Sequence, residues 1–310
     1  MAKFREFTYP SSDGIHNCYA CQWLPDEGEP KAVVQLVHGV SEYVGRYDHF
    51  ARFLADHGYA VCGEDHLGHG KTGAEDSIFG YFGKHDGWTL VTADVRQLRQ
   101  LMGEQYSGIP YIMMGHSMGS FLTRTYLCRY PSTIDGAILS GTGQESAPLV
   151  AAGKAIAATI ANIKGADAVS PLVHSLSLGA YNKQFAPNRT TADWISRDEA
   201  VVDTYLEDPF CSVMPTVGLY RDMLGGLQYI ASNRALSQMD PNTPVYIFSG
   251  DKDPVGSNGV GVKKVYGYFK KQGTKDLSMK LYAGGRHEML NEINKEEVYA
   301  DVLVWLEQHT

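Results

Sequence analysis

One serine lies in a short motif bounded by glycines, GHSMG at residues 115–119. The motif follows an apolar run at 111–114, which predicts a buried strand, and it precedes a helical pattern at 121–130. A turn this tight between a strand and a helix exposes the serine hydroxyl and requires small neighbours. The N-terminus of the following helix also favours developing negative charge. The motif therefore predicts Ser117 as a nucleophile.

A serine hydroxyl needs a base to remove its proton, and a carboxylate must orient an imidazole base. His287 follows two glycines after an apolar run at 278–282, which predicts a loop at the carboxyl end of the last strand. Asp251 and Asp253 both follow the strand expected at 245–249. We favour Asp253, because the residue nearest a strand end is more often a turn former, and Asp251 stays the alternative.

A tetrahedral intermediate carries a negative oxygen that two hydrogen-bond donors must stabilise. The residue after the nucleophile supplies one backbone amide, that of Met118. The segment His38-Gly39-Val40 follows the strand expected at 32–37, so we expect the second amide from Val40 and an orienting role for His38. The alternative for this His-Gly pair is a simple turn at the end of a strand.

Two other groups contain residues of the types that bind metal ions. Cys18 and Cys21 are spaced like half of a zinc site, but no second pair of cysteines or histidines sits at matching spacing. Asp65, His66 and His69 form the other group, for which a hydrogen-bonded loop is the favoured interpretation. The sequence therefore predicts neither a metal nor another cofactor.

The composition is that of an ordinary globular protein, with 44% hydrophobic and 20% charged residues among 310. The formal net charge is −8 and no cluster of Lys and Arg is present, which argues against a nucleic-acid partner. Five scattered cysteines predict free thiols in a reducing compartment. The first residues lack a secretory pattern and no long apolar stretch occurs, so we expect no membrane insertion and a cytoplasmic location.

Alternating strand and helix patterns predict an α/β fold, with a mostly parallel central sheet and helices on both faces. A hairpin is expected at 4–9 and 15–24, further strands at 59–62 and 136–140, and helices in the intervals. The alternation stops after 140, where helical patterns at 151–163 and 213–230 replace strands. We therefore predict a core of residues 1–143 and 236–310 with an inserted helical cap, or lid, at 144–235.

These residues resemble the monoacylglycerol lipase and lysophospholipase-like branch of the α/β-hydrolases, serine hydrolases whose triad runs in the order Ser, Asp, His. The matching segments are HGVSEYVGRY (38–47), DHLGHG (65–70), GHSMG (115–119), SRD and VDTYLEDP (within 196–209), GDKDPV (250–255) and GGRHE (ending at residue 288). The resemblance implies the α/β-hydrolase fold, the triad Ser117, Asp253 and His287, and the Val40 amide as an oxyanion donor. Ser120 departs from the family, in which a third glycine is common.

The resemblance implies hydrolysis of a small-molecule carboxylic ester, most readily that of a single-chain lipid. Five apolar residues of the predicted cap either line an acyl tunnel or pack against the core, namely Leu149, Val150, Ile156, Ile160 and Ile163. The cap also leaves room for a transient contact with a membrane surface. A short-chain carboxylesterase and a proline iminopeptidase-like peptidase are the alternative enzymes. The peptidase is an alternative because cap carboxylates could hold a substrate amine, namely Glu199, Asp203, Glu207 and Asp208. A non-catalytic ligand-binding protein of this fold is the third alternative. The oligomeric state is left open.

Overall fold

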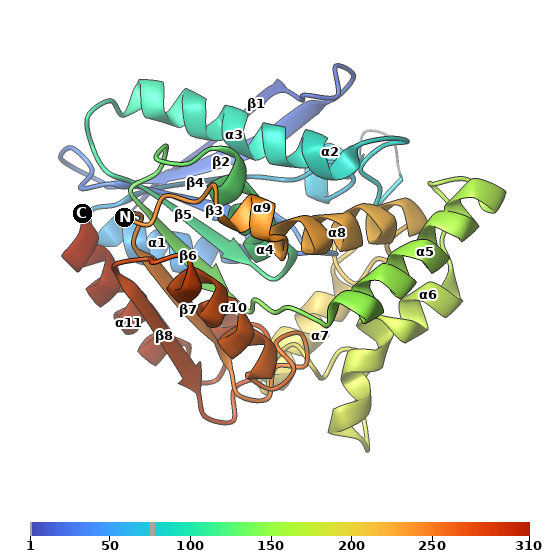
Figure 1. Cartoon of the computed structure of the whole chain (residues 1–310). Helices are drawn as coiled ribbons and strands as arrows, with labels where there is room; N and C mark the ends of the chain where they lie inside the picture. The colour runs from blue at the N-terminus through green and yellow to red at the C-terminus, as the bar shows by residue number, and fades with distance from the viewer. Residues whose placement is uncertain (1, 75–77) are drawn as a thin grey trace.

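One sheet of eight strands forms the centre of the molecule, as the computed structural model shows for residues 2–74 and 78–310 (Figure 1). In spatial order the strands run β1-β2-β4-β3-β5-β6-β7-β8. Their bounds are β1 (Lys3–Pro10), β2 (Asn17–Leu24), β3 (Val33–Val37), β4 (Ala60–Glu64), β5 (Tyr111–His116), β6 (Gly136–Ser140), β7 (Val245–Gly250) and β8 (Leu277–Tyr282).

The sheet is antiparallel at one edge and parallel elsewhere. Strands β1 and β2 form the predicted hairpin, and β2 pairs antiparallel with β4. From β4 through β8 every neighbouring pair is parallel, so the carboxyl ends of these strands share one edge. Every residue of β3 to β7 is buried, as expected for parallel strands covered on both faces.

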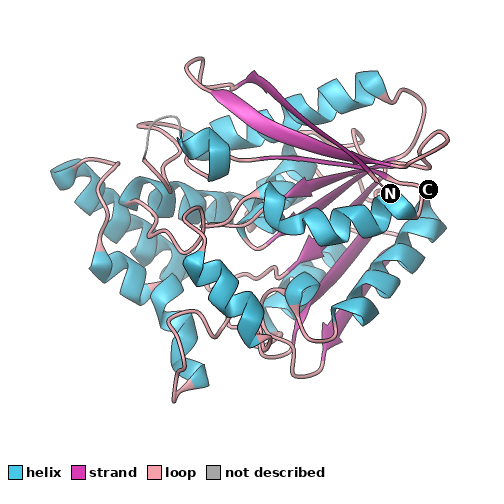
Figure 2. Cartoon of the chain, turned by 180° about the vertical axis from the view of Figure 1, so that it is seen from behind, coloured by secondary structure: helices cyan, strands magenta, loops and turns pink. Residues whose placement is uncertain are grey.

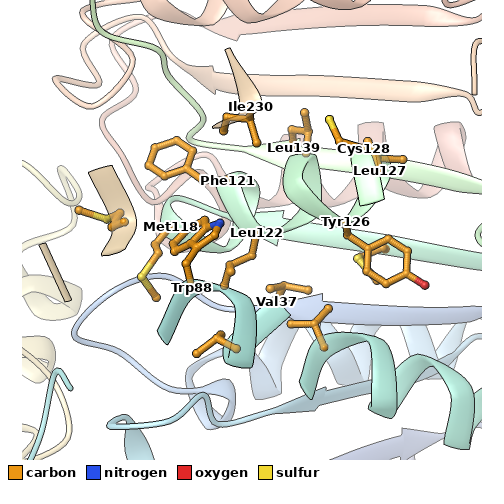
Figure 3. Packing of buried hydrophobic residues seen from close by; sticks show 14 of the residues in the cluster. Val37, Trp88, Met118, Phe121, Leu122, Tyr126, Leu127, Cys128, Leu139 and Ile230 are labelled. Atoms are coloured by element: carbon orange, nitrogen blue, oxygen red, sulfur yellow. The ribbon is translucent and has the colours of Figure 1, made fainter. Parts of the chain in front are cut away.

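Helices cover both faces because neighbouring strand residues point to opposite sides. Val33 and Val37 pack on one side with α3, α4 and α10, a cluster that Figure 3 shows around Leu122. Val34 and Leu36 pack on the other side with α1 and α11. These helices are η1 (Val44–Tyr47), α1 (Asp48–Asp56), α2 (Gly70–Ala74), α3 (Gly87–Gln105), α4 (Met118–Arg129), α10 (Val260–Lys271), η3 (Met289–Asn291) and α11 (Lys295–His309).

The chain between β6 and β7, here called the β6–β7 segment (residues 141–244), is helical and adds no strand to the sheet. Its helices are α5 (Ala147–Lys164), α6 (Pro171–Leu176), η2 (Leu178–Phe185), α7 (Glu199–Glu207), α8 (Val217–Ile230) and α9 (Asn233–Leu236). Helices α5 and α6 lie at the opposite side of the molecule from the two termini (Figures 1 and 2). The predicted fold class is confirmed, whereas the division into core and cap at residues 144 and 235 stays a prediction. None of the described helices has the length and hydropathy needed to cross a bilayer.

Candidate active site

Ser117 lies in a strained turn between β5 and α4. Its backbone has φ 53° and ψ −121°, values that an L-residue rarely adopts. The turn also needs its glycines, since a Cβ at Gly119 would lie 1.8 Å from the Val37 oxygen and one at Gly115 would lie 2.3 Å from the Gly119 oxygen. Ser120, the departure from the family pattern, donates from Oγ to the Ser117 carbonyl oxygen at 2.6 Å. The strand–turn–helix expected around Ser117 is therefore present.

His287 and Asp253 meet although 34 residues separate them in the chain. The His287 Nδ1 lies 2.9 Å from Asp253 Oδ1, and both side chains are almost fully buried. Asp253 also accepts hydrogen bonds from the Val255 amide at 2.9 Å and from Ser249 Oγ at 2.7 Å. These bonds hold the carboxylate in one orientation, so the imidazole that it contacts is oriented too.

The electrostatic surroundings of His287 favour its cation. Burial lowers the pKa of His287, but the charge and hydrogen bond of Asp253 outweigh it, so the pKa lies above its usual value. Asp251, the alternative acid, contacts the same loop differently, because its Oδ1 accepts a hydrogen bond from the Gly284 amide at 2.8 Å. Of the two candidate carboxylates, the structure brings Asp253 to the imidazole.

The loop after β3 lies against the nucleophile, where a Cβ on Gly39 would be 3.1 Å from Ser117 Cβ. His38 Nδ1 lies 2.7 Å from the Gly39 carbonyl oxygen, and His38 Nε2 accepts the His66 amide proton at 3.0 Å. Neither the Val40 nor the Met118 amide donates to an acceptor among the described residues. Both predicted oxyanion donors are thus free to bind a ligand oxygen.

A buried ionic network, which sequence reasoning missed, joins this loop to the His287 loop. The Arg46 guanidinium binds both carboxylate oxygens of Glu288 at 2.8 Å each and reaches Glu42 Oε2 at 2.9 Å. Glu42 in turn accepts the Gly39 amide at 2.5 Å. The Arg46 guanidinium also lies 4.9 Å from the ring centre of Tyr205 in the β6–β7 segment. The signal was present in HGVSEYVGRY and GGRHE, which contain all three charges.

The two carboxylates of the network differ in their titration. Burial raises the pKa of Glu288, but Arg46 lowers it more, to about 2. Burial is the largest effect on Glu42 and raises its pKa, with Glu288 adding to the rise and Arg46 opposing it. The network therefore keeps Glu288 ionised beside His287.

An apolar cavity of about 350 Å³ lies between α4 and the helices of the β6–β7 segment. Phe121, one helical turn after Ser117, and Val255, two residues after Asp253, are among its lining residues. Of the apolar residues considered for an acyl tunnel, Leu149, Val150 and Ile156 line this cavity. Ile160 instead packs on the core and Ile163 is exposed. The cavity thus runs from the nucleophile helix to α5.

The two groups with metal-ligand types have other contacts. Cys18 and Cys21 pack in separate clusters on opposite faces of the sheet, and all five cysteines are free and buried. Asp65 accepts the amides of Val44 and Lys71 at 2.9 Å and 2.8 Å. Within residues 2–74 and 78–310 no cluster of three His, Cys, Asp or Glu side chains is suited to a metal ion.

The sequence model of one protein family, described as serine aminopeptidase, S33, matches residues 28–294 of this chain. The chain belongs to this family. A monoacylglycerol lipase of Mycolicibacterium smegmatis is 29% identical over 98% of this chain and 97% of that protein. A human monoglyceride lipase is 26% identical over 94% of this chain and 87% of its own length.

Solved structures agree on the fold. A thermostable carboxyl esterase from Bacillus coagulans, crystallised with glycerol, superposes with a TM-score of 0.92 at 28% identity and covers 100% of this chain and 99% of its own. A monoglyceride lipase from Saccharomyces cerevisiae gives a TM-score of 0.74 at 21% identity, covering 100% of this chain and 96% of its own. The chain is an α/β-hydrolase, as the resemblance implied.

Proposed function

We propose that this α/β-hydrolase cleaves carboxylic esters of single-chain lipids, monoacylglycerols foremost, through an acyl-enzyme on Ser117. The observation that carries the proposal is the buried, hydrogen-bonded pair of His287 and Asp253, which follows parallel strands of the same sheet edge as the strained serine at the N-terminus of α4. Relatives named monoacylglycerol lipase and monoglyceride lipase, aligned over nearly the whole chain, support the same reaction.

In the first half of the reaction, Ser117 Oγ attacks the ester carbonyl while His287 Nε2 takes the hydroxyl proton. Asp253 stabilises the imidazolium through Nδ1, and the amides of Val40 and Met118 hold the oxyanion. His287 then protonates the leaving alcohol. In the second half, water attacks the acyl-enzyme with His287 as general base, and the fatty acid leaves.

The cavity supports an apolar acyl group. Its lining is largely aliphatic and aromatic, with Leu149, Met223 and Leu227 from α5 and α8, and 350 Å³ is within the usual range for small-molecule sites. Each methylene that enters such a cavity contributes about 0.8 kcal/mol of transfer free energy. A single acyl chain therefore binds better here than an acetyl group.

The alternative functions have weaker support. None of the four cap carboxylates considered for a substrate amine lines the cavity, namely Glu199, Asp203, Glu207 and Asp208. Glu199 and Asp203 pair instead with Arg189. Glu145 is the one carboxylate among the described residues that line the cavity. A purely binding role would leave the His287–Asp253 pair without a use. A short-chain esterase remains the alternative that the substrate series below separates.

Hydrolysis of p-nitrophenyl esters from acetate to palmitate, beside 1-monoacylglycerols, tests the proposal with wild type and Ser117→Ala. We expect the kcat of wild type to fall about 10⁵- to 10⁶-fold in Ser117→Ala, because the nucleophile is lost. Medium or long chains should be preferred. The matched control is Ser237→Ala. Ser237 is an exposed serine that directly follows α9, so this variant should retain full activity. Turnover that survives in Ser117→Ala would contradict the nucleophile, and activity confined to acetate would contradict the lipid substrate.

We also propose a transient contact of the β6–β7 segment with lipid surfaces. Leu172 and Leu176 on α6 are 59% and 65% exposed, beside the cavity that Leu176 lines. Leu172→Ser, which leaves the cavity lining intact, should lower the rate on monoacylglycerol in vesicles and leave p-nitrophenyl butyrate hydrolysis unchanged. Val304→Ser on α11, 52% exposed, is the control. Equal rates of all variants on vesicles would refute the contact.

The cytoplasm is the proposed location. All five cysteines are free, which fits a reducing compartment. Cell fractionation with an antibody to the native protein tests this, and recovery outside the cytoplasm would contradict it.

A further inference from the structure

A buried carboxyl group that the mechanism does not use lies beneath the oxyanion loop. Glu64 ends β4, its side chain is fully buried, and neither of its oxygens accepts a hydrogen bond from the described residues. His66 Nδ1, which has no hydrogen-bond partner among the described residues either, lies 3.3 Å from Glu64 Oε1. A buried carboxylate without donors is costly, so its protonation and its partner need an explanation.

His66 connects this carboxyl group to the oxyanion loop. Its Nε2 lies 3.2 Å from the His38 carbonyl oxygen, and its ring stacks on the His38 ring at 3.9 Å. The His66 backbone amide donates to His38 Nε2, so His38 carries its proton on Nδ1 and donates it to the Gly39 oxygen. Because C=O and N–H of one trans peptide point in opposite directions, holding the Gly39 oxygen aims the Val40 amide.

The single ring hydrogen bond of His66 to a described residue, from Nε2, and the 3.3 Å approach of its Nδ1 to Glu64 Oε1 together favour one additional proton. If Glu64 is ionised and His66 is neutral, one ring nitrogen carries a proton and the other presents a lone pair. A lone pair on Nε2 would face the His38 oxygen, and a lone pair on Nδ1 would face the carboxylate. In both arrangements a nitrogen lone pair faces an oxygen lone pair, which is repulsive. A further proton, either on Glu64 or on His66, removes this repulsion. In either case the pair has no net charge and Nε2 carries a proton.

We propose that Glu64 and His66 hold one proton between them and that Glu64 thereby positions the Val40 amide through His66 and His38. Glu64 is then a positioning residue for ester hydrolysis, and this inference rests on the proposed function because the Val40 amide acts only once an oxyanion forms. The neighbouring histidines do not compete for the proton. Burial lowers the pKa of His69 to about 3, and burial also lowers that of His38 well below its usual range.

The shared proton has a second consequence. An ionised Glu64 beside a neutral His66 would place an uncompensated negative charge behind the loop that must bind an oxyanion. A neutral pair removes that charge while keeping the Nε2 proton on the His38 oxygen. The proton therefore serves both the geometry and the electrostatics of the oxyanion site.

Two substitutions of Glu64 separate these effects from simple packing. In Glu64→Gln the side-chain amide donates to His66 Nδ1, which keeps the proton on Nε2 without a charge, so we expect a kcat within about threefold of wild type. In Glu64→Leu the donor is lost, and we expect kcat to fall about 10- to 100-fold with KM within about twofold, part of the loss seen when an oxyanion donor is removed. A boronic acid inhibitor should weaken in parallel with kcat.

The control is Gln35→Leu, a change of another fully buried polar side chain, one strand away on β3, whose bonds go to Val95 and Tyr111. It should lower stability without lowering kcat per labelled site, with sites counted by fluorophosphonate. Equal kcat in Glu64→Leu and wild type would overturn the proposal. Equal losses in Glu64→Gln and Glu64→Leu would also overturn it, since the donor would then be irrelevant.

A measurement on the wild type needs a variant only to assign the His66 signal. Nitrogen-15 NMR of histidine-labelled protein, with His66 assigned through His66→Gln, reads which ring nitrogens carry protons. A proton on Nε2 of His66 at neutral pH is expected, and a proton on Nδ1 alone would overturn the proposal. Because the spectrum is independent of turnover, it distinguishes this inference from a failure of Ser117-dependent hydrolysis.

Discussion

The strand-end cluster (the loops that carry Val40, Ser117, Asp253 and His287) and the β6–β7 segment are built by different interactions. In the cluster, polar groups are buried and held by several directed bonds, as the three hydrogen bonds to Asp253 show. In α5 and α6 of the β6–β7 segment, apolar side chains face solvent, and Ile163 is 76% exposed. Directed bonds fix the orientation of the proposed catalytic groups, whereas non-directional apolar contact suits the acyl chain of the proposed substrate.

Among the tests of this difference, the largest change in kcat is expected from replacing Asp253, the proposed acid of the cluster. Asp253→Asn keeps the size of the side chain but removes the charge that stabilises the His287 cation and selects its tautomer. We expect kcat to fall about 10⁴-fold, as for asparagine in place of the acid of a serine-protease triad, while thermal unfolding changes little. Asp251→Asn, the control, should stay within about tenfold of wild type in steady-state assays. Equal losses in both variants would show that the assignment of the acid is wrong.

The pH dependence of activity and of stability provides a second test of the His287–Asp253 pair. Because the pKa of His287 is raised, the acid limb of the kcat/KM profile should lie above about 6.5, the unperturbed value. The stabilising free energy of the His287–Asp253 pair runs the other way. It is fully present below about pH 6.5 and is lost as the pH rises through the folded pKa. An acid limb below pH 6 in wild type would contradict the raised pKa.

The ionic network of Arg46 predicts the largest loss of stability. Arg46→Met leaves Glu42 and Glu288 buried without their cation, which should lower the free energy of unfolding by about 3–5 kcal/mol in urea at pH 7. The loss should shrink in acid as Glu288 is protonated. Arg52→Met is the matched control, because its pair with Asp48 is about 40% exposed and should contribute about 0–1 kcal/mol. Similar losses in the two variants would refute the distinction between cluster and surface.

The sequence could propose catalytic residues for the strand-end cluster because the signals for each of them are local. GHSMG at 115–119 needs one strand, one turn and one helix, and each of these has its own signal within a few residues. The carboxyl ends of parallel strands then bring Ser117, Asp253 and His287 to one edge without any knowledge of side-chain packing. The apolar patterns along the sequence predicted every strand of the sheet to within a few residues.

The remaining features depend on contacts between distant residues of the chain. Arg46 and Glu288 are 242 residues apart, and neither sequence segment by itself indicates that the two side chains pair. Glu64 lay just beyond the strand expected at 59–62, so its burial was not foreseen. In the β6–β7 segment the apolar pattern could not separate lining from packing, because helices use the same residues for both. That is why Val150 and Ile163 on α5 could not be distinguished before their surroundings were known.

The smallest expected effect tests the β6–β7 segment itself. Val150 is almost fully buried and lines the cavity, so Val150→Phe should fill part of the space that an acyl chain needs. Each methylene excluded costs about 0.8 kcal/mol, or about fourfold in kcat/KM, so the preferred p-nitrophenyl ester should become shorter while butyrate hydrolysis is retained. Ile163→Phe on the same helix lies outside the cavity and should leave the chain-length profile unchanged. If the two variants share one profile, α5 packs on the core without selecting the substrate, and the chain length is set by residues of the strand-end cluster instead.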